Sequence, residues 1–169
     1  LEYCLGQPFY RTYDTWVSLD TSPESLERWN LRPKNYICVQ PGAANGTPTP
    51  KTWHPENFVK LSEKLSDRDD KTVVLLGDSG DHDNIISKWK WPTDALNLAG
   101  RTSIEELGNL IGNASCVVAH DSGIMHLANA MNVPLVALYG PTNHTATRPL
   151  GKRSEILFSR TSAFAIMYQ

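Results

Sequence analysis

The sequence predicts an α/β fold, with a parallel sheet of about six strands and helices on both faces, on two observations. From Tyr36 onward, short runs rich in apolar and β-branched residues alternate with segments of helical periodicity, which is typical of a parallel sheet. Several of these runs are continuously apolar, as expected of strands covered on both faces. The predicted strands are Tyr36–Gln40, Thr72–Gly77, Ala95–Leu98, Cys116–Ala119, Pro134–Tyr139 and Glu155–Phe158.

Three segments between these strands carry apolar residues along one helical face. They are Pro55–Asp67, Ser103–Ala114 and Ser122–Met131. Pro55 suits a first helical turn, and Thr102 or Ser103 followed by two glutamates predicts an N-terminal cap. A weaker pattern predicts a fourth helix over His82–Lys90.

The alternation begins at residue 36 and defines the predicted domain, residues 36–169. A chain of 169 residues suffices for one ordinary hydrophobic core but not for two. Residues 1–35 scatter aromatic side chains among polar ones without a sustained period. We therefore expect a connector or edge segment there, with a short helix at Pro23–Asn30.

Composition and charge exclude several classes of protein. Apolar residues make up 40% and charged residues 20%, as in globular domains. A net charge of −2 supplies no broad positive field, so we expect no nucleic-acid partner. No apolar stretch approaches the roughly 20 residues of a membrane span, and no signal peptide is recognisable, so we expect a cytoplasmic location. The three cysteines form no C-x-x-C pair and are expected to be buried, reduced thiols.

Glycine, aspartate and histidine concentrate in loops that follow predicted strands, where open parallel sheets bind ligands. The first loop, Pro41–Lys51, has small residues that let backbone N–H groups approach an anion, and Lys51 adds a positive charge. In the second, Gly77–Asp83, the Asp81 carboxylate is a candidate acceptor for ribose hydroxyls. A solvated lysine and a solvated acidic turn remain the alternatives.

The most informative loop is His120–His126, which joins a predicted strand to a predicted helix. Gly123 removes a side chain where the first helical N–H groups would point at a phosphate, and the helix dipole favours negative charge there. Ser122 and His126 are four residues apart and share a helix face away from the apolar stripe. Asp121 either caps the helix or faces a ligand.

A fourth loop, Tyr139–His144, ends the next predicted strand. Together the four loops favour a shared ligand cleft over separate surface turns. A metal site is disfavoured because its possible ligands are near neighbours in sequence that cannot easily converge on one ion. Those possible ligands are Asp78, Asp81, His82 and Asp83.

Six sequence blocks occur in a specific order between about Tyr36 and Phe158. The blocks are P-G-A, K-x-W-x-P-E-x-F from Lys51 to Phe58, V-V-L-L-G, N-L-A-G-R-T-S-I-E-E-L, D-S-G-x-x-H-L-A-x-A and P-x-V-A-L-Y-G-P-T. In this combination the chain resembles glycosyltransferase family 9, the ADP-heptose lipopolysaccharide heptosyltransferases. No single block would be specific.

The resemblance implies one half of a GT-B fold, which consists of two Rossmann-like domains. The C-terminal domain holds most of the donor nucleotide-sugar, and this chain resembles that domain. By resemblance, Lys51 would contact the donor diphosphate. Asp81 would take the place of a family carboxylate on the ribose, where a longer glutamate is often found.

The remaining donor-binding residues implied by the resemblance lie in the His120–His126 loop. Ser122 and Gly123 would bind phosphate through their N–H groups, while Asp121 and His126 would lie near the donor sugar. No cofactor is implied, and the family needs no metal in the chemical step. The general base of the family is a carboxylate of the N-terminal domain, so we expect no catalytic residue in this chain.

The implied reaction is inverting transfer of a sugar, heptose by resemblance, from a nucleotide diphosphate sugar such as ADP-heptose. The implied acceptor is a lipopolysaccharide-type glycan or another lipid-linked glycan. The implied partners also include an N-terminal GT-B domain. The full-length enzyme would be cytoplasmic and peripheral at the inner membrane. We expect this chain alone to bind donor with little or no transfer.

Two other interpretations stay open. One is a non-catalytic module that binds a nucleotide or nucleotide-sugar. The other is a nucleotide-sugar epimerase or NAD-type domain, since a fold alone does not fix function. The absence of G-x-G-x-x-G after the first predicted strand counts against dinucleotide binding.

Overall fold

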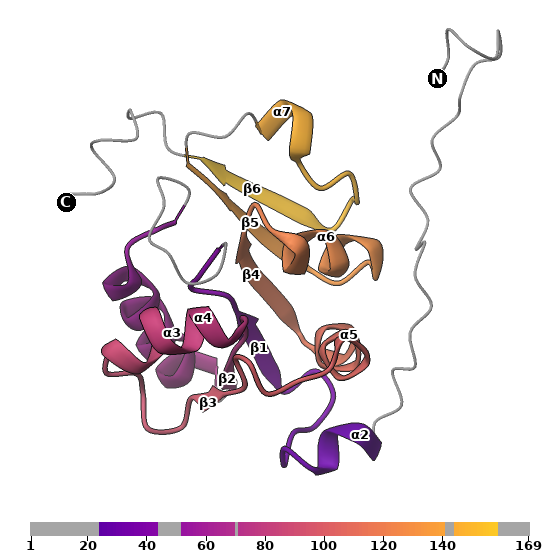
Figure 1. The fold of residues 1–169 in the computed structure, drawn as a ribbon. Coiled ribbons are helices and arrows are strands. Elements are labelled where there is room, and N and C mark those ends of the chain that lie inside the picture. Colours follow the sequence, from indigo (N-terminus) through magenta and orange to yellow (C-terminus); the bar gives the residue numbers. More distant parts are fainter. Residues whose placement is uncertain (1–23, 44–51, 70, 141–143, 159–169) are drawn as a thin grey trace, which may run out of the picture.

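At the centre of the computed structural model is a six-stranded parallel sheet in the order β3-β2-β1-β4-β5-β6 (Figure 1). The structure describes residues 24–43, 52–69, 71–140 and 144–158. The strands are β1 (Tyr36–Val39), β2 (Thr72–Leu75), β3 (Leu96–Asn97), β4 (Cys116–His120), β5 (Leu135–Tyr139) and β6 (Ser154–Phe158). The α/β prediction is confirmed, and the strand order is that of a Rossmann-like sheet.

Helices cover both faces of the sheet (Figure 1). On one face lie α3 (Pro55–Asp69) and the 3-10 helix η1 (Ile86–Lys88). On the other face lie α2 (Glu24–Glu27), α5 (Ile104–Asn113) and α6 (Gly123–Ala130). Two short helices follow strand ends: α4 (Ser79–Asn84) comes after β2, and α7 (His144–Thr147) comes after β5.

The sheet separates two hydrophobic clusters, and β1 contributes to both. Tyr36 and Cys38 pack in the cluster under α5 and α6, whereas Ile37 and Val39 pack in the cluster around Phe58 of α3. All four strand residues are buried. A strand that contacts apolar layers on both sides has no polar face, which explains the continuous apolar runs in the sequence.

The predicted helix over His82–Lys90 is wrong at its start and is interrupted within. Helix α4 begins at Ser79 because Asp78 and Asp81 form a capping box. The Asp81 N–H donates to Asp78 Oδ1 at 2.8 Å, and the Asp78 N–H donates to Asp81 Oδ2 at 3.2 Å. Most of the predicted acidic loop is therefore helical, and the chain re-forms as η1 after Ile85.

The described part of the predicted connector or edge segment packs against α5. Leu26 and Leu31 are buried in the main cluster. Lys34 closes the carboxyl end of α5, since its Nζ donates to the carbonyl oxygens of Gly112 and Ala114, each at 2.9 Å. The last carbonyls of a helix lack intrahelical partners and carry partial negative charge, so an ammonium group stabilises them.

Replacing Lys34 by methionine should lower the free energy of unfolding by about 1 kcal/mol, because the side chain keeps its length and loses both hydrogen bonds. The matched control is Lys60→Met on α3, whose exposed ion pair with Glu56 should contribute much less to stability. Urea unfolding of both variants measures the difference. Equal losses would contradict the capping role of Lys34.

Candidate functional site

The strand order reverses between β1 and β4, and ligands of parallel α/β sheets bind beyond the carboxyl ends of the strands at such a point. Two side chains meet across this junction. Ser122, at the start of α6, donates its hydroxyl to Oε1 of Gln40 at 2.5 Å, just after the end of β1. Gln40 is buried. The β1 loop and the first turn of α6 are therefore held together.

His120, the last residue of β4, makes a second connection across the same junction. Its Nε2 accepts from the Trp53 backbone N–H at 2.8 Å, and its Nδ1 lies 3.1 Å from the carbonyl oxygen of Gly42. A carbonyl only accepts, so Nδ1 carries the proton and Nε2 is bare.

Burial keeps the His120 ring neutral. The side chain is fully buried, and this desolvation lowers the pKa of His120 from its ordinary 6.5 to about 4, against the opposing effect of the Gly42 hydrogen bond. The ring of Phe58 packs edge-on against it, with ring centres 5.1 Å apart. One neutral tautomer is therefore fixed from several sides.

The first turn of α6 is not covered by other described residues at Gly123. Ser122 is the N-cap residue in extended conformation, and its side chain makes no capping hydrogen bond because it is directed to Gln40. Apart from its own helix and chain neighbours, no described residue has an atom within 4 Å of a Cβ placed on Gly123. His126 is exposed, whereas Ile124 and Ala128 are buried, so His126 lies off the apolar stripe as predicted. This geometry suits an anion at the helix start.

Asp121 lies on the α7 side of the same turn. Its Oδ2 accepts from the Thr147 hydroxyl at 3.3 Å, and the Tyr139 hydroxyl donates to the Thr147 carbonyl oxygen at 2.9 Å. Burial raises the pKa of the Tyr139 phenol, which therefore stays protonated and able to donate. These contacts join the end of β5 and helix α7 to the β4–α6 turn.

Asp81 is buried, with 2% of its surface exposed. Its carboxylate lies so close to Gly42 and Gly77 that a Cβ on either glycine would overlap it. Only glycine at position 42 allows this approach. Asp81 therefore connects the β1 loop to the β2 end, and its carboxylate points into this contact rather than toward solvent.

The structure brings most of the predicted site residues to one edge of the sheet. Asp121, Ser122, Gly123 and His126 form the start of α6, and Asp81 lies against the neighbouring β1 loop. Lys51 lies outside the described residues, as does most of the Pro41–Lys51 loop. Trp53, two positions after Lys51, contacts His120 and so lies at this edge.

Two polar residues at the β1–β4 junction, Gln40 and His120, were not predicted as site residues. Each ends a buried apolar strand, and that position is the signal that sequence alone offers. A polar side chain at the end of a buried strand requires hydrogen-bond partners nearby. Which partners they are depends on the pairing of β1 with β4, which the sequence does not specify.

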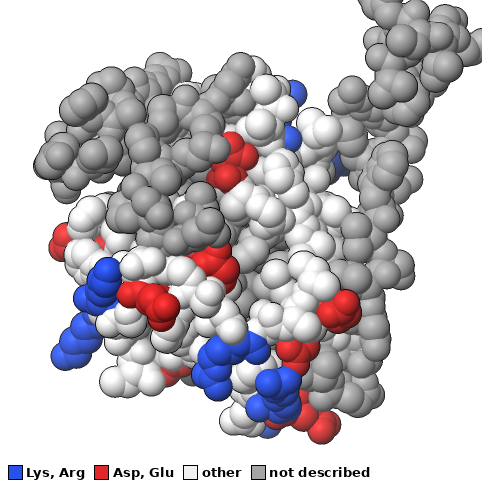
Figure 2. All heavy atoms as spheres, viewed as in Figure 1, with Lys and Arg blue, Asp and Glu red and all other residues white. Residues whose placement is uncertain are grey.

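Charge is mixed on the visible surface. Figure 2 shows acidic and basic side chains interspersed over the lower half of one face, without a broad field of one sign among the described residues.

Within the described part of the chain, no group of three histidine, cysteine or acidic side chains is arranged to hold a metal ion. None of its helices combines the length and apolar character needed to cross a bilayer. Cys38 and Cys116 are free thiols; Cys38 is buried and Cys116 partly so.

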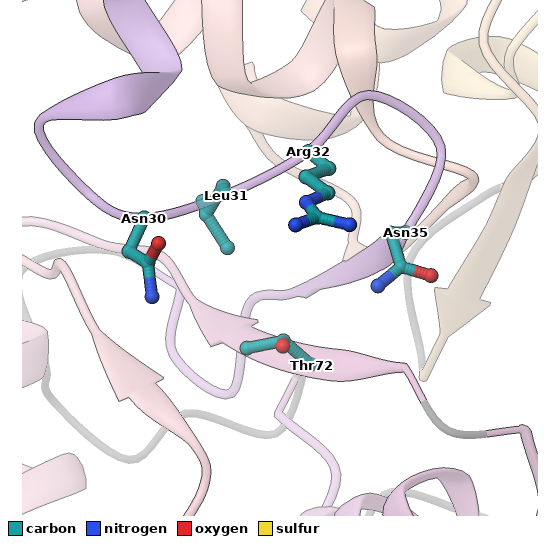
Figure 3. A pocket seen from close by; sticks show the side chains of 5 residues that line it. All are labelled: Asn30, Leu31, Arg32, Asn35 and Thr72. Atoms are coloured by element: carbon teal, nitrogen blue, oxygen red, sulfur yellow. The ribbon is translucent and has the colours of Figure 1, made fainter.

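A separate pocket of about 240 Å³ lies at the opposite, amino-terminal edge of the sheet (Figure 3). It is lined by Asn30, Leu31, Arg32, Asn35 and Thr72, next to the starts of β1 and β2. None of the predicted site residues lines it. The sheet therefore separates this pocket from the junction at the carboxyl ends.

Comparison with known proteins gives a family match. The family model of glycosyltransferase family 9 (heptosyltransferase) matches residues 10–165. Lipooligosaccharide heptosyltransferase 2 of Haemophilus influenzae is 38% identical over 122 residues, which are 69% of this chain and 34% of that protein. Lipopolysaccharide heptosyltransferase 2 of Escherichia coli is 36% identical over 131 residues, 75% of this chain and 36% of that protein.

A solved structure extends this likeness to three dimensions. The ADP-heptose lipopolysaccharide heptosyltransferase II of Escherichia coli superposes with a TM-score of 0.74 and 28% identity, covering 95% of this chain and 53% of that one. The chain spans about a third of the length of the curated relatives it matches.

Because His120 is neutral in the folded chain, the free energy of unfolding should decrease as the pH falls. In the unfolded chain the imidazole takes up a proton below about pH 6.5, whereas the folded chain resists protonation down to about pH 4. Unfolding free energy should therefore drop by about 3 kcal/mol between these limits through this group. Urea unfolding from pH 4 to 7 measures it.

One variant separates His120 from other titrating groups. His120→Leu should flatten the pH dependence by that amount, because it removes the buried imidazole. A pH dependence that is the same in His120→Leu as in the unmodified chain would contradict the neutral, buried state of His120.

Proposed function

The chain belongs to glycosyltransferase family 9, and from this premise we propose that it is the donor-binding domain of a heptosyltransferase. It binds a nucleotide diphosphate sugar, ADP-heptose, at the carboxyl edge of the sheet. The whole enzyme transfers heptose with inversion to a lipopolysaccharide-type, lipid-linked glycan. Residues 36–169 form the donor domain, and residues 1–35 are its connector or edge segment, whose described part packs against α5.

One observation carries this proposal. The first turn of α6 stands at the point where the strand order reverses, and among the described residues nothing outside its own helix crowds Gly123. A helix start presents N–H groups and the positive end of a dipole, and a glycine lets a phosphate approach them. The donor diphosphate binds there, next to Ser122.

The other site residues take their places around that diphosphate. Lys51 pairs with the diphosphate charge. Asp121, just before the N-cap of α6, and His126, within α6, contact the donor sugar. Asp81 contacts the ribose in this proposal, which requires its carboxylate to turn away from the Asp78 N–H that it now accepts from. In its present position it supports Gly42 instead.

The chemistry follows from charge. As the bond between the sugar and the nucleoside diphosphate breaks, the diphosphate gains negative charge. Fixed N–H donors and a lysine stabilise this charge more in the transition state than in the ground state. A general base must reach the acceptor hydroxyl, and the family places that carboxylate in the N-terminal domain. This chain therefore supplies donor binding.

The whole enzyme works in the cytoplasm, peripheral to the inner membrane that holds its lipid-linked acceptor.

Titration calorimetry with ADP, UDP and GDP tests the donor. ADP should bind most tightly, and Lys51→Ala should weaken it about tenfold because a charged contact to phosphate is lost. Lys60→Ala on α3 removes the same charge from an exposed position and should leave ADP binding unchanged. Equal, weak binding of all three nucleotides would count against the proposal.

Gly123→Leu separates binding from stability. A side chain at position 123 meets no described residue outside its own helix, so the free energy of unfolding should stay within about 0.5 kcal/mol of the original or rise. The same side chain fills the space next to the helix start, so the Kd for ADP should rise about tenfold or more. Unchanged ADP affinity in the folded variant would place the diphosphate elsewhere.

A further inference from the structure

We propose that His120 is a positioning residue of the donor site, holding Gly42 and Trp53, the described ends of the β1–α3 connection, against the start of α6. The inference rests on the proposed function, because its consequence for ligand binding assumes a diphosphate at that helix start. His120 itself is enclosed by protein and touches no donor atom in this proposal.

The two ring nitrogens face two different partners. Nδ1 donates to the Gly42 carbonyl oxygen at 3.1 Å, and Nε2 accepts from the Trp53 N–H at 2.8 Å. Gly42 follows β1 and Trp53 precedes α3, so one side chain connects to both ends of one connection. A neutral imidazole carries one donor and one acceptor on opposite sides of a rigid ring, which is what this bridge requires.

Aromatic packing holds the ring and one of its partners in place. Phe58 contacts His120 edge-on at 5.1 Å and contacts the Trp53 ring in the same manner at 5.1 Å. Phe58 is fully buried in the cluster on the α3 face. The end of the connection at Trp53 is therefore fixed by its backbone through His120 and by its ring through Phe58.

The fixed point lies beside the proposed ligand. His120 ends β4, and Ser122, two residues later, is the N-cap of α6 and is itself joined to Gln40 of the β1 end. Gly42, Trp53 and the helix start are thus linked to one anchor at the end of β4. A site that is ordered before binding loses less entropy when the ligand arrives. Removing the anchor should cost affinity beyond any cost in stability.

Two conservative replacements each keep one half of the bridge. The amide of asparagine overlays Nδ1 and can donate to Gly42, and the amide of glutamine overlays Nε2 and can accept from Trp53. Leucine has similar bulk and keeps neither contact. Val133→Ala, at the amino end of β5, is the control for general destabilisation, since Val133 is buried on the opposite edge.

Two measurements on the same chain test the bridge, the first without ligand. Long-range ¹H–¹⁵N NMR should show the Nδ1–H tautomer of His120. Amide exchange of Trp53 should accelerate about tenfold or more in His120→Leu and His120→Asn, and much less in His120→Gln and Val133→Ala. A protonated Nε2, or equal Trp53 exchange in all four variants, overturns the bridge.

Calorimetry with ADP then tests its consequence. The Kd should rise about tenfold in His120→Leu and less in the asparagine and glutamine variants, while Val133→Ala keeps the original value even where its stability falls equally. If the Kd for ADP changes only in proportion to the free energy of unfolding across these variants, the positioning role is overturned. If the unmodified chain does not bind ADP, the proposed function fails, and the tautomer and exchange results still decide whether the bridge exists.

Discussion

The parallel pairing of β1 with β4 is the constraint on which the site depends. Val39 stands opposite Val118, so the residues that follow these two strands leave the sheet side by side. Because the chain continues from β1 to β2 on one side and from β4 to β5 on the other, the segments that follow these two strands lead away in opposite directions. Gln40, Gly42, His120 and Ser122 interact only because this register brings them together.

The sequence predicted the layers well because burial on both faces leaves a strong pattern. Each predicted strand agrees with an observed strand to within a few residues, since continuous apolar runs have few alternative placements. Helix α4 was misplaced because its start is set by the reciprocal contacts of Asp78 and Asp81, a short-range signal without apolar periodicity. The anchoring of α5 by Lys34 involves residues far apart in sequence, so no local pattern indicated it.

The site was predicted in part, for a related reason. Ser122, Gly123 and His126 follow from a strand-to-helix turn with a glycine at its start, which is a local feature. Gln40 and His120 gain their roles from partners far away in the sequence, and a sequence without known strand order cannot supply those partners. For Asp81, an acidic residue after a strand predicts a ligand contact, which stays a prediction, and no local pattern indicates the close approach of its carboxylate to Gly42.

The most direct test of the central claim is an amide-resolved NMR titration of the ¹⁵N-labelled chain with ADP. The account predicts saturable shifts concentrated at Gly42, Trp53, Ser122 and Gly123, on both sides of the β1–β4 junction. Saturable shifts that gather instead around Asn30 and Arg32, at the amino-terminal edge of the sheet, would contradict it.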